Sequence, residues 1–381
     1  MIRSGKTTGV KQLQNNNSID TSIKLKTIAQ VCPRYYPDIG GVNTHVKEIS
    51  ERLVQRGFNV EVLTTNNSPE LPRYEKINGV VVRRFKSWSP GNAYHFSTQL
   101  SKFLQQNAGR YSVVHAHSYH AFPAYYAAIN NKDAALVFTA HYHGRGHTRI
   151  RSVLLKMYKM VGSRIFIDAE KVVAVSEYER DLILKDFKID DDKVEVIPNG
   201  IDKKEFLGIA KRKNIGQTIL SVGRLEKYKG MQDLVRVMPH LDPSIKLEIV
   251  GKGPYQSKLY SLIKQMGIEN RVKIMHDLPR KELVQKYFDS KLFVLLSANE
   301  AYGICVAEAL ASRTPCIVAK ASALNEWVDN ENCYGIDLPI QLEKLKSLIE
   351  STLGRTVQEV NLMDWDDITK QLINLYAEVM R

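Results

Sequence analysis

Short runs of valine and isoleucine alternate with longer amphipathic stretches along this chain from Lys26 onward. The short runs have the length and the branched side chains of buried strands, and the longer stretches have the spacing of helices that cover a sheet. The pattern predicts an α/β fold made of βα units. The strands predicted in the first half are Thr27–Cys32, Asn59–Thr65, Val80–Phe85, Ser112–His115, Ala135–Thr139, Lys171–Val175 and Val194–Ile197.

The same pattern restarts in the second half, after the polar stretch Lys203–Asn214. Turn formers and a lysine cluster without apolar periodicity make this stretch the predicted linker. A chain of 381 residues fits two domains of ordinary size, so the restart predicts a second α/β domain. Its predicted strands are Thr218–Val222, Lys246–Val250, Val272–Met275, Leu292–Leu296 and Pro315–Val318.

Near the end of the chain, Trp365, Ile368, Leu372 and Leu375 follow one another at spacings of three and four, which predicts a final helix. Such a helix can pack on either domain, including a return to the first. The first residues are polar and basic and predict a loose tail. The predicted organisation is a tail 1–22, a first domain 23–202, a linker 203–214, a second domain 215–355 and a C-terminal helix 356–381.

Composition narrows the class of protein. Neither a membrane-spanning apolar run nor the apolar core of a signal peptide is visible, which predicts a cytoplasmic protein. The four cysteines have no paired spacing and predict reduced thiols. A net charge of +13 favours anionic partners such as phosphates, acidic lipid surfaces or nucleic acid. No RNA-binding sheet motif or recognition helix is visible, so a nucleic-acid-binding protein is only a distant alternative.

Two glycine-rich or basic loops follow predicted strands. Gly40 and Gly41 come after the first strand and open a helix, where free amides and the helix dipole favour an anion. Ordinary turn chemistry explains such glycines equally well. In the second half, Arg224 and Lys229 follow the strand Thr218–Val222, at the sheet edge where α/β proteins bind ligands. A planar arginine and a lysine suit two linked phosphates, and Gly253 follows the next strand.

The segment after Leu292–Leu296 carries the most specific pattern, because Glu300 and Glu308 bracket a helix that starts near Gly303. The amides of Gly303, Ile304 and Cys305 can meet a phosphate, and carboxylates accept hydrogen bonds from hydroxyls. A polyol attached to a diphosphate offers both groups. The alternative is a helix cap at Glu300 and a surface acid at Glu308, but the apolar neighbours of Glu308 disfavour a surface position.

At these residues the chain resembles the retaining glycosyltransferase family 4, over nearly all of the sequence from Lys26 to Arg381. The resemblance implies the GT-B architecture, two Rossmann-like domains facing across a cleft, and a nucleoside-diphosphate sugar as donor. Glu300 would then hold hydroxyls of the sugar and Glu308 the ribose, with Tyr302 and Gly303 as the aromatic–glycine pair. The remaining donor-side residues that the resemblance implies are Arg224 and Lys229 for the diphosphate, Ile304 and Cys305 for the donor, and Asp277 and Leu278 near the base. The loop glycines Gly40, Gly41 and Gly253 are also placed on the donor side.

In the first half, the strings PDIGGVNTHV and IPNGID resemble the glycine loop and the interdomain segment of the family. FTAHYHG resembles its motif around a histidine near the reacting sugar, which points to His141 as a catalytic residue together with Arg224, Lys229 and Glu300. His117 and Asn199 are placed on the acceptor side. Two departures are visible: Tyr142 stands where the family usually has aspartate, and KASALNE, 320–326, stands where many members have a glycine pair.

Histidines cluster in the same region, at His115, His117, His120, His141, His143 and His147. A metal site there is a weighed alternative, but no acidic or thiolate partner has a convincing ligand spacing. The resemblance also implies a metal-independent reaction, with Arg224 and Lys229 neutralising the leaving group. We therefore expect neither a metal nor another cofactor.

The sequence thus predicts a retaining, metal-independent hexosyltransferase that uses a UDP- or GDP-linked sugar and a hydroxyl acceptor, including a lipid-linked one. A nucleotide-sugar hydrolase, an epimerase or a sugar phosphorylase of the same fold is the alternative. The predicted helix 147–166 is basic and amphipathic. Contact with an anionic membrane surface and an ordinary solvated cationic face explain this helix equally well.

Overall fold

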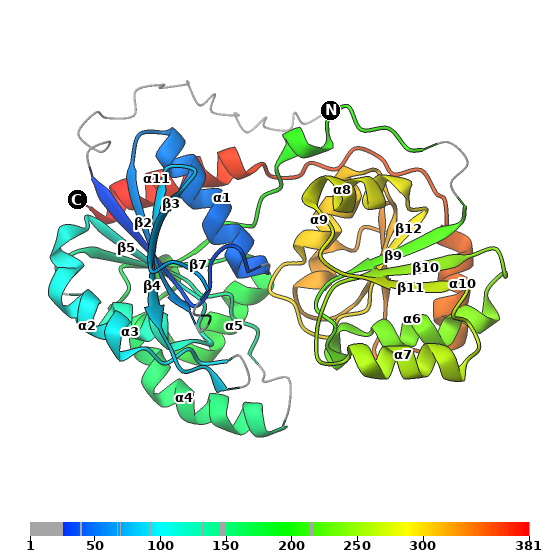
Figure 1. The fold of residues 1–381 in the computed structure, drawn as a ribbon, viewed down its shortest axis with the longest axis horizontal. Helices are drawn as coiled ribbons and strands as arrows, with labels where there is room; N and C mark the ends of the chain where they lie inside the picture. The colour runs from blue at the N-terminus through cyan, green and yellow to red at the C-terminus, as the bar shows by residue number, and fades with distance from the viewer. Residues whose placement is uncertain are drawn as a thin grey trace, which may run out of the picture.

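The computed structural model describes residues 26–380 apart from 39, 67, 69, 91–92, 132, 145–148 and 213–215, and the side chains of 149–157 also lie outside the description. The chain forms two lobes, each built on one sheet with helices on both faces (Figure 1). The predicted tail 1–22, the residue His147 and the apolar and basic side chains predicted over 149–157 lie outside the described residues.

The first lobe contains an eight-stranded sheet in the order β3-β4-β2-β1-β5-β6-β7-β8, parallel except for the β3–β4 pair. The strand that the sequence pattern missed is β3, whose short polar segment lacks a buried face. A hairpin through Asn78 and Gly79, both with positive φ, joins it to β4. The strands are β1 (Thr27–Cys32), β2 (Asn59–Asn66), β3 (Tyr74–Ile77), β4 (Val80–Lys86), β5 (Val113–His117), β6 (Ala135–Thr139), β7 (Lys171–Ala174) and β8 (Val194–Val196).

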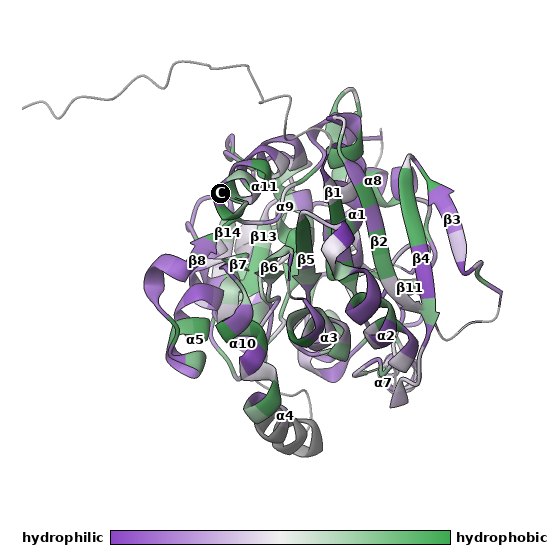
Figure 2. Cartoon of the chain, turned by 90° about the vertical axis from the view of Figure 1, so that its left-hand side faces the viewer, coloured by the Kyte–Doolittle hydropathy of each residue, from purple (hydrophilic) through white to green (hydrophobic). Residues whose placement is uncertain are grey.

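Helices cover both faces of this sheet, and the central strands β1, β2 and β5 are hydrophobic over much of their length (Figure 2). Leu100 of α2, Ala124 of α3 and Ile183 of α5 share one core with Phe138. Another core joins residues of α1 and α11 on the opposite face. The helices of this lobe are α1 (Gly41–Gln55), α2 (Thr98–Asn107), α3 (Phe122–Asn130), α4 (Arg149–Asp168), α5 (Glu177–Phe187) and α11 (Trp365–Val379).

The second lobe contains a six-stranded parallel sheet in the order β11-β10-β9-β12-β13-β14. The short strand β14 was not predicted and pairs in register with β13. The strands are β9 (Thr218–Val222), β10 (Lys246–Val250), β11 (Val272–Met275), β12 (Leu292–Leu295), β13 (Cys316–Ala319) and β14 (Cys333–Ile336). The helices are α6 (Met231–Val237), α7 (Gln256–Gln265), α8 (Arg280–Asp289), α9 (Ile304–Ala311) and α10 (Leu342–Thr352).

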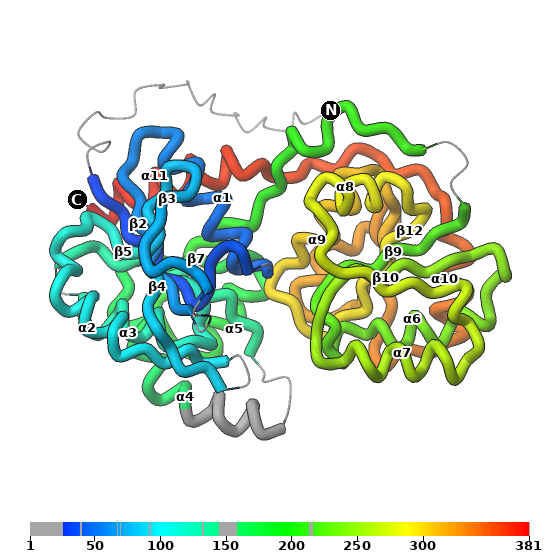
Figure 3. Tube along the Cα trace, in the orientation of Figure 1, coloured from blue at the N-terminus to red at the C-terminus, as the bar shows by residue number. Residues whose placement is uncertain are grey.

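The chain passes twice between the lobes, and the two passages lie side by side (Figure 3). The Ile201 amide donates to the Met363 carbonyl at 2.9 Å, and the Trp365 amide donates to the Ile201 carbonyl at 3.1 Å. Gly200 permits this approach, because a Cβ there would lie 2.6 Å from the Trp365 amide nitrogen. The helix α11 therefore returns to the first lobe, where Trp365 is buried in the same core as Ile49 of α1.

The order of the strands determines where loops can gather around a ligand. In the second sheet the order reverses between β9 and β12, and in the first sheet it reverses between β1 and β5. Parallel strands end at a common edge, and α/β proteins bind ligands beside such a reversal. The loops after β1, β5, β9 and β12 are therefore the candidate loops for a site.

Candidate active site

Lys229 and Glu300 form an ion pair between the loops that follow β9 and β12. Both side chains are largely buried, with 11% and 16% exposed. Burial opposes the charged lysine, but the neighbouring Glu300 carboxylate outweighs it and raises the pKa of Lys229. A permanently charged ammonium beside a carboxylate can bind an anion and a hydroxyl at adjacent positions. The structure thus brings together two residues predicted separately.

The loop that carries Glu300 is fixed by its neighbours. The Glu300 amide donates to the Ser322 hydroxyl at 2.9 Å, and the Ala323 amide donates to the Glu300 carbonyl at 3.3 Å. Gly230 allows the loop after β9 to approach, because a Cβ there would lie 2.4 Å from the Leu296 carbonyl oxygen. The segment 320–326, which departs from the family pattern, therefore supports Glu300 directly.

The helix α9 begins at Ile304, with Gly303 in the left-handed region at φ 100° as its N-cap. The intrahelical bonds begin with the Val306 amide, which donates to the Gly303 carbonyl at 2.8 Å. The amides of Ile304 and Cys305 precede that bond, so they have the orientation that an anion at a helix N-terminus requires. The Trp327 indole donates to the Tyr302 carbonyl at 2.8 Å and braces this turn.

Glu308 lies inside α9 and is only 8% exposed. Its carboxylate accepts from the Arg280 guanidinium at 2.6 Å and from the Tyr287 hydroxyl at 2.8 Å. Arg280 also donates to Glu205 at 2.8 Å. The acid is thus paired in a largely apolar environment. Each carboxylate oxygen retains a lone pair with which a ribose hydroxyl could be bound.

The loops after β10 and β11 lie next to the loop after β9. The Leu225 amide donates to the Lys252 carbonyl at 2.9 Å, and a Cβ on Gly253 would lie 2.3 Å from the Leu225 carbonyl oxygen. Asp277 is exposed and paired with Lys252, and the hydrogen bond from Lys252 lowers the pKa of this carboxyl. Leu278 is partly buried against the core of the second lobe.

Arg224 is exposed over 62% of its side chain and donates to Glu226 at 3.1 Å. Its charge acts on a residue of the other lobe, Arg34, which follows β1. Burial lowers the pKa of Arg34, and the positive charge of Arg224 lowers it further, whereas Asp38 raises it. The two arginines thus act on each other across the lobe boundary, and an anion bound between them would relieve this repulsion. The sequence pattern missed Arg34, although it follows β1 much as Arg224 follows β9.

His141 follows β6 in the left-handed region at φ 46° and is 9% exposed. The next residue, Tyr142, stands where the family usually has aspartate. Its hydroxyl donates to Asp186 at 2.6 Å, and its backbone amide donates to the Glu179 carboxylate. Glu179 also accepts the Val175 amide at 2.6 Å, and burial raises the pKa of Glu179 to about 8. The backbone that carries His141 is thus held by Glu179.

Sequence reasoning missed Glu179, although a signal was present. Ser176 and Glu179 have the spacing of a capping box at the start of α5, and the Glu179 amide donates to the Ser176 hydroxyl at 3.1 Å. The carboxylate reaches past the usual capping position to the loop after β6. The capping motif therefore indicated Glu179, but it could not indicate the distant contact with the Tyr142 amide.

His117 and Asn199, which were predicted on the acceptor side, lie beside His45 of α1. His45 Nδ1 lies 2.6 Å from the Asn199 side-chain oxygen, and His117 Nε2 lies 2.6 Å from the Gln30 side-chain oxygen. The rings of His45 and His141 meet edge to face at 5.0 Å. Three buried imidazoles from distant parts of the chain thus surround one point.

Gly40 is the N-cap of α1, and Gly41 is its first residue. A Cβ on Gly41 would meet nothing within 4 Å, and one on Gly40 would meet only the Asn43 side chain at 3.8 Å. Packing within the protein therefore does not require glycine at these two positions. The open space above them is available to a ligand.

Two described contacts join the lobes near these loops. The Asn299 side-chain amide lies 3.0 Å from His143 Nδ1, and the Tyr178 amide at the start of α5 donates to the Glu326 carboxylate at 2.6 Å. Asn299 precedes Glu300, and His143 lies two residues after His141. The loops of the predicted catalytic residues therefore meet at the lobe boundary.

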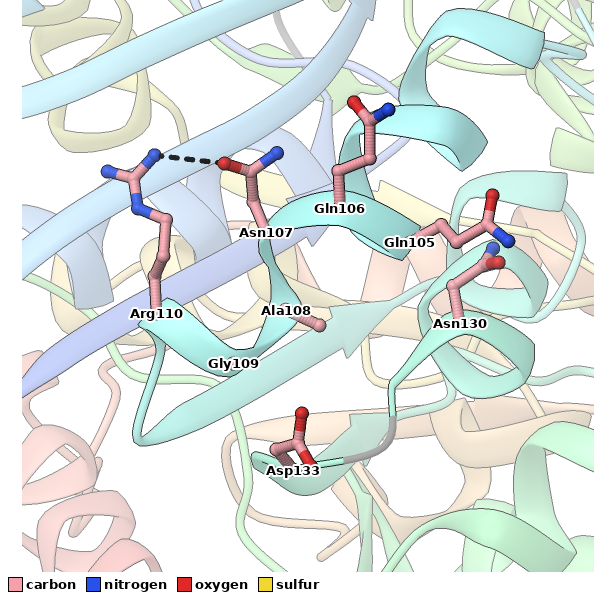
Figure 4. A pocket seen from close by; sticks show the side chains of 8 residues that line it. All are labelled: Gln105, Gln106, Asn107, Ala108, Gly109, Arg110, Asn130 and Asp133. Carbon is pink, nitrogen blue, oxygen red and sulfur yellow. Dashed lines mark hydrogen bonds between the residues drawn. The ribbon is translucent and has the colours of Figure 1, made fainter.

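A cavity of about 280 Å³ lies elsewhere, lined by uncharged side chains together with Arg110 and Asp133 (Figure 4). It sits between the end of α2 and the end of α3, where strands β5 and β6 begin. This is the opposite edge of the sheet from the histidines. The cavity therefore contributes nothing to the candidate site.

Two Rossmann-like lobes, with basic, acidic and imidazole groups gathered at the carboxyl ends of their strands, define the GT-B class of glycosyltransferase folds. Two family models match the chain in succession, Glycosyltransferase Family 4 over residues 39–205 and Glycosyl transferases group 1 over residues 202–353. The chain belongs to this family of glycosyltransferases.

The chain is also similar to individual glycosyltransferases and to solved structures of this fold. An uncharacterized glycosyltransferase of Methanocaldococcus jannaschii is 28% identical over 93% of this chain and 98% of its own length. The GPI3 subunit of the phosphatidylinositol N-acetylglucosaminyltransferase of Saccharomyces cerevisiae is 22% identical over 92% of this chain and 83% of its own. The crystal structure of Anabaena HepE with UDP-glucose has a TM-score of 0.75 at 17% identity, over 93% of this chain and 100% of its own.

Within the described residues, none of the helices combines the length and the apolar character needed to cross a bilayer.

Proposed function

We propose that this protein is a retaining hexosyltransferase that takes its sugar from a UDP- or GDP-linked donor. The observation that carries the proposal is the Lys229–Glu300 ion pair beside the N-terminus of α9. In this arrangement the ammonium and the free amides bind the diphosphate, and the Glu300 carboxylate accepts hydrogen bonds from sugar hydroxyls. The co-crystallisation of HepE with UDP-glucose supports a nucleotide sugar as the donor.

The remaining donor groups extend the same binding mode. Glu308 holds the ribose, and the base lies near Gly253, Asp277 and Leu278, whose loops lie against the loop after β9. Arg224 and Arg34 approach the diphosphate from opposite lobes. Leaving-group charge is then neutralised by Lys229 and the two arginines, so the reaction is proposed to need no metal and no other cofactor.

The acceptor binds against the first lobe, near His117 and Asn199, whereas Gly40 and Gly41 of the loop before α1 contact the donor. His141 faces the reacting sugar, and the departing phosphate oxygen takes the proton of the attacking hydroxyl. The attack occurs on the face from which the leaving group departs, through an oxocarbenium-like transition state, which retains the anomeric configuration. No residue in this scheme acts as a covalent nucleophile.

A lipid-linked acceptor is the favoured acceptor class. The relative in yeast is named as a phosphatidylinositol N-acetylglucosaminyltransferase, which supports a glycolipid product. In this chain Met160 and Ile167 of α4 are exposed over 84% and 60% of their surface. We propose that this helix contacts an anionic membrane surface. Sedimentation with anionic liposomes tests this, and M160S/I167S should reduce the bound fraction while M160L/I167L should not.

The experiment for the donor is a binding screen of UDP- and GDP-sugars by saturation-transfer NMR, followed by a transfer assay with the binding donor. A retaining transferase forms a product whose anomeric coupling matches the donor. Sugar release to water without transfer identifies a hydrolase, and phosphate-dependent formation of a sugar phosphate identifies a phosphorylase. Either result, or binding that survives in K229A, overturns the proposal.

A further inference from the structure

Three imidazoles from three elements converge in the first lobe. His45 lies on α1, His117 ends β5 and His141 follows β6. Each has one ring nitrogen within 4.8 Å of the other two. Their ring centroids are 5.0 Å apart for His45 and His141, 5.4 Å for His45 and His117, and 6.1 Å for His117 and His141.

In His45 and His117, the ring nitrogen that points away from the other two imidazoles, here called the outer nitrogen, fixes the tautomer of the ring. His45 Nδ1 lies 2.6 Å from the Asn199 side-chain oxygen, and His117 Nε2 lies 2.6 Å from that of Gln30. An amide oxygen only accepts, so the proton of each neutral ring lies on that outer nitrogen. His45 Nε2 and His117 Nδ1 therefore carry lone pairs.

These lone pairs have nothing to bind among the described residues. His45 Nε2, His117 Nδ1 and His141 Nε2 are all buried there without a hydrogen-bond partner. His45 and His117 have 0% exposure and His141 has 9%. An unpaired buried acceptor is costly, so the lone pairs of His45 Nε2 and His117 Nδ1, with His141 Nε2 beside them, favour a common electron-pair acceptor. That acceptor is a cation or the hydrogens of a water molecule.

A shared proton is disfavoured. Burial lowers the pKa of His45 to about 4 and also lowers the pKa of His117 and His141 well below its usual value. The charges of His45 and His115 lower the pKa of His117 and His141 further, and the nearby Trp365 brings no negative charge. Neutral imidazoles at neutral pH are the form that coordinates metal ions.

We propose that His45, His117 and His141 form a binding site for a divalent transition-metal ion of the zinc class. Three imidazoles match the ligand set of open zinc sites, in which water or a substrate oxygen takes the fourth position. Magnesium and calcium prefer oxygen ligands and are not expected here. At zinc–nitrogen distances of about 2.0–2.1 Å a tetrahedral centre has nitrogens about 3.4 Å apart, so binding draws the rings together.

The surroundings have the form of a built metal site. Metal-bound histidines commonly donate their other ring nitrogen to a fixed acceptor, and Asn199 and Gln30 occupy these positions. Gln30 also donates to the Tyr376 hydroxyl at 3.3 Å, which orients its oxygen toward His117. Through Tyr376, the helix α11 thus helps to orient Gln30, the hydrogen-bond acceptor of His117.

This histidine set differs from the group visible in the sequence. His120 and His143 stack on each other at 4.1 Å and 19°, and His143 contacts Asn299. His115 has both nitrogens within hydrogen-bond distance of hydroxyls, those of Tyr376 and Thr139. The residue that completes the proposed site is His45, about 70 residues before its first partner in the chain.

The ion would act as an inhibitor of transfer rather than as its cofactor. Coordination occupies the lone pair of His141, which the proposed reaction leaves free to face the sugar. This consequence rests on the proposed function, whereas the site itself does not.

The test is a titration of the full-length, chelator-treated protein with Co²⁺, in the absence of any sugar donor. The expected result is one ion bound per chain, with the visible d–d absorption of a four-coordinate centre that Zn²⁺ abolishes. H45Q and H117Q should lose this absorption, and H240Q, at an exposed histidine, should keep it. N199A should bind about 10–100-fold more weakly, because it removes only the outer acceptor.

Circular dichroism of each variant separates lost binding from lost folding. If H45Q or H117Q unfolds, the N199A titration and histidine NMR of the wild-type protein with Zn²⁺ provide the result instead. The proposed site is overturned if the wild-type protein gives no such absorption, or if folded H45Q binds Co²⁺ as tightly as wild type. In either case the partner of the three imidazoles is a water molecule. The inhibition is overturned if Zn²⁺ binds at this site and transfer continues unchanged.

Discussion

The ammonium of Lys229 is paired with the carboxylate of Glu300, two residues that are separated by 71 positions in the chain. Neither side chain would be stable in this largely buried position without the other. The pair links the loop after β9 to the loop after β12 at the reversal of strand order. It is the structural feature on which the proposed donor side of the site rests.

Removing the lysine should abolish most of the transfer. K229A removes the charge that we propose neutralises the leaving diphosphate, and the loss of one such group costs about 100–1,000-fold in kcat. Steady-state kinetics with the identified donor measures this effect. K227A is the matched control, because Lys227 lies on the same short turn and is exposed. Equal losses in the two variants would contradict the assignment.

Removing the carboxylate should reduce stability as well as activity. E300A leaves the largely buried Lys229 ammonium without its partner, which costs about 3–5 kcal/mol when a buried pair is broken. The free energy of unfolding, measured in urea, should fall by an amount of this order. E331A, at an exposed acid of the same lobe, should leave it unchanged. An E300A protein as stable as wild type would show that the pair contributes little.

The arginines on either side of the lobe boundary should bind the nucleoside diphosphate together. A hydrogen bond to a charged group is worth about 1.5–3 kcal/mol, so R34A and R224A should each weaken UDP or GDP binding by about 10–150-fold. Calorimetry on both single variants and on R34A/R224A measures their coupling. Tight binding in R34A would show that the first lobe does not contact the diphosphate.

The bond between Glu326 and the start of α5 should hold the lobes together. A carboxylate at a helix N-terminus contributes about 1 kcal/mol, so E326A should shift the balance toward a more open form by about fivefold. Small-angle X-ray scattering should show a larger radius of gyration, and the KM for donor should rise. E331A again serves as the control. No change in scattering would show that other contacts hold the lobes.

The buried histidines should make the protein sensitive to acid. The pKa of His45 falls from 6.5 to about 4 on folding, and the pKa values of His115, His117 and His141 also fall. At these histidines the unfolded chain binds more protons, so their contribution to stability is complete above pH 6.5 and is lost as the pH falls toward 4, whereas Glu179, with its raised pKa, contributes a slope of opposite sign. Each histidine contributes a slope of up to about 1.4 kcal/mol per pH unit.

Urea unfolding at pH 7.5, 6.0 and 5.0, without added metal, measures the slope. H45Q should reduce the slope of the unfolding free energy against pH by the contribution of one histidine. H240Q, at an exposed histidine, should leave that slope unchanged. A wild-type slope that persists in full in H45Q would show that His45 is not one of the groups responsible.

Local patterns accounted for most of the fold. The branched runs located the sheets of both lobes, because the period of a strand or a helix is a property of a short segment. The strands β3 and β14 were missed, since the first has no buried face and the second, CYGI, contains a glycine and no run of branched side chains. The spacing of Trp365, Ile368, Leu372 and Leu375 predicted the final helix, and its return to the first lobe was one of two open options.

The sequence by itself also determined the chemistry available at each loop, including the Glu300 and Glu308 pair around the start of α9. Only the tertiary structure decided which of these groups meet. Lys229 pairs with Glu300 because the order of the strands makes β9 and β12 neighbours. The charge of Arg224 lowers the pKa of Arg34 because the loops that carry them come from different lobes and lie close together. His45, His117 and His141 converge because α1, β5 and β6 pack together, and contacts between distant segments have no period that a local pattern could reveal.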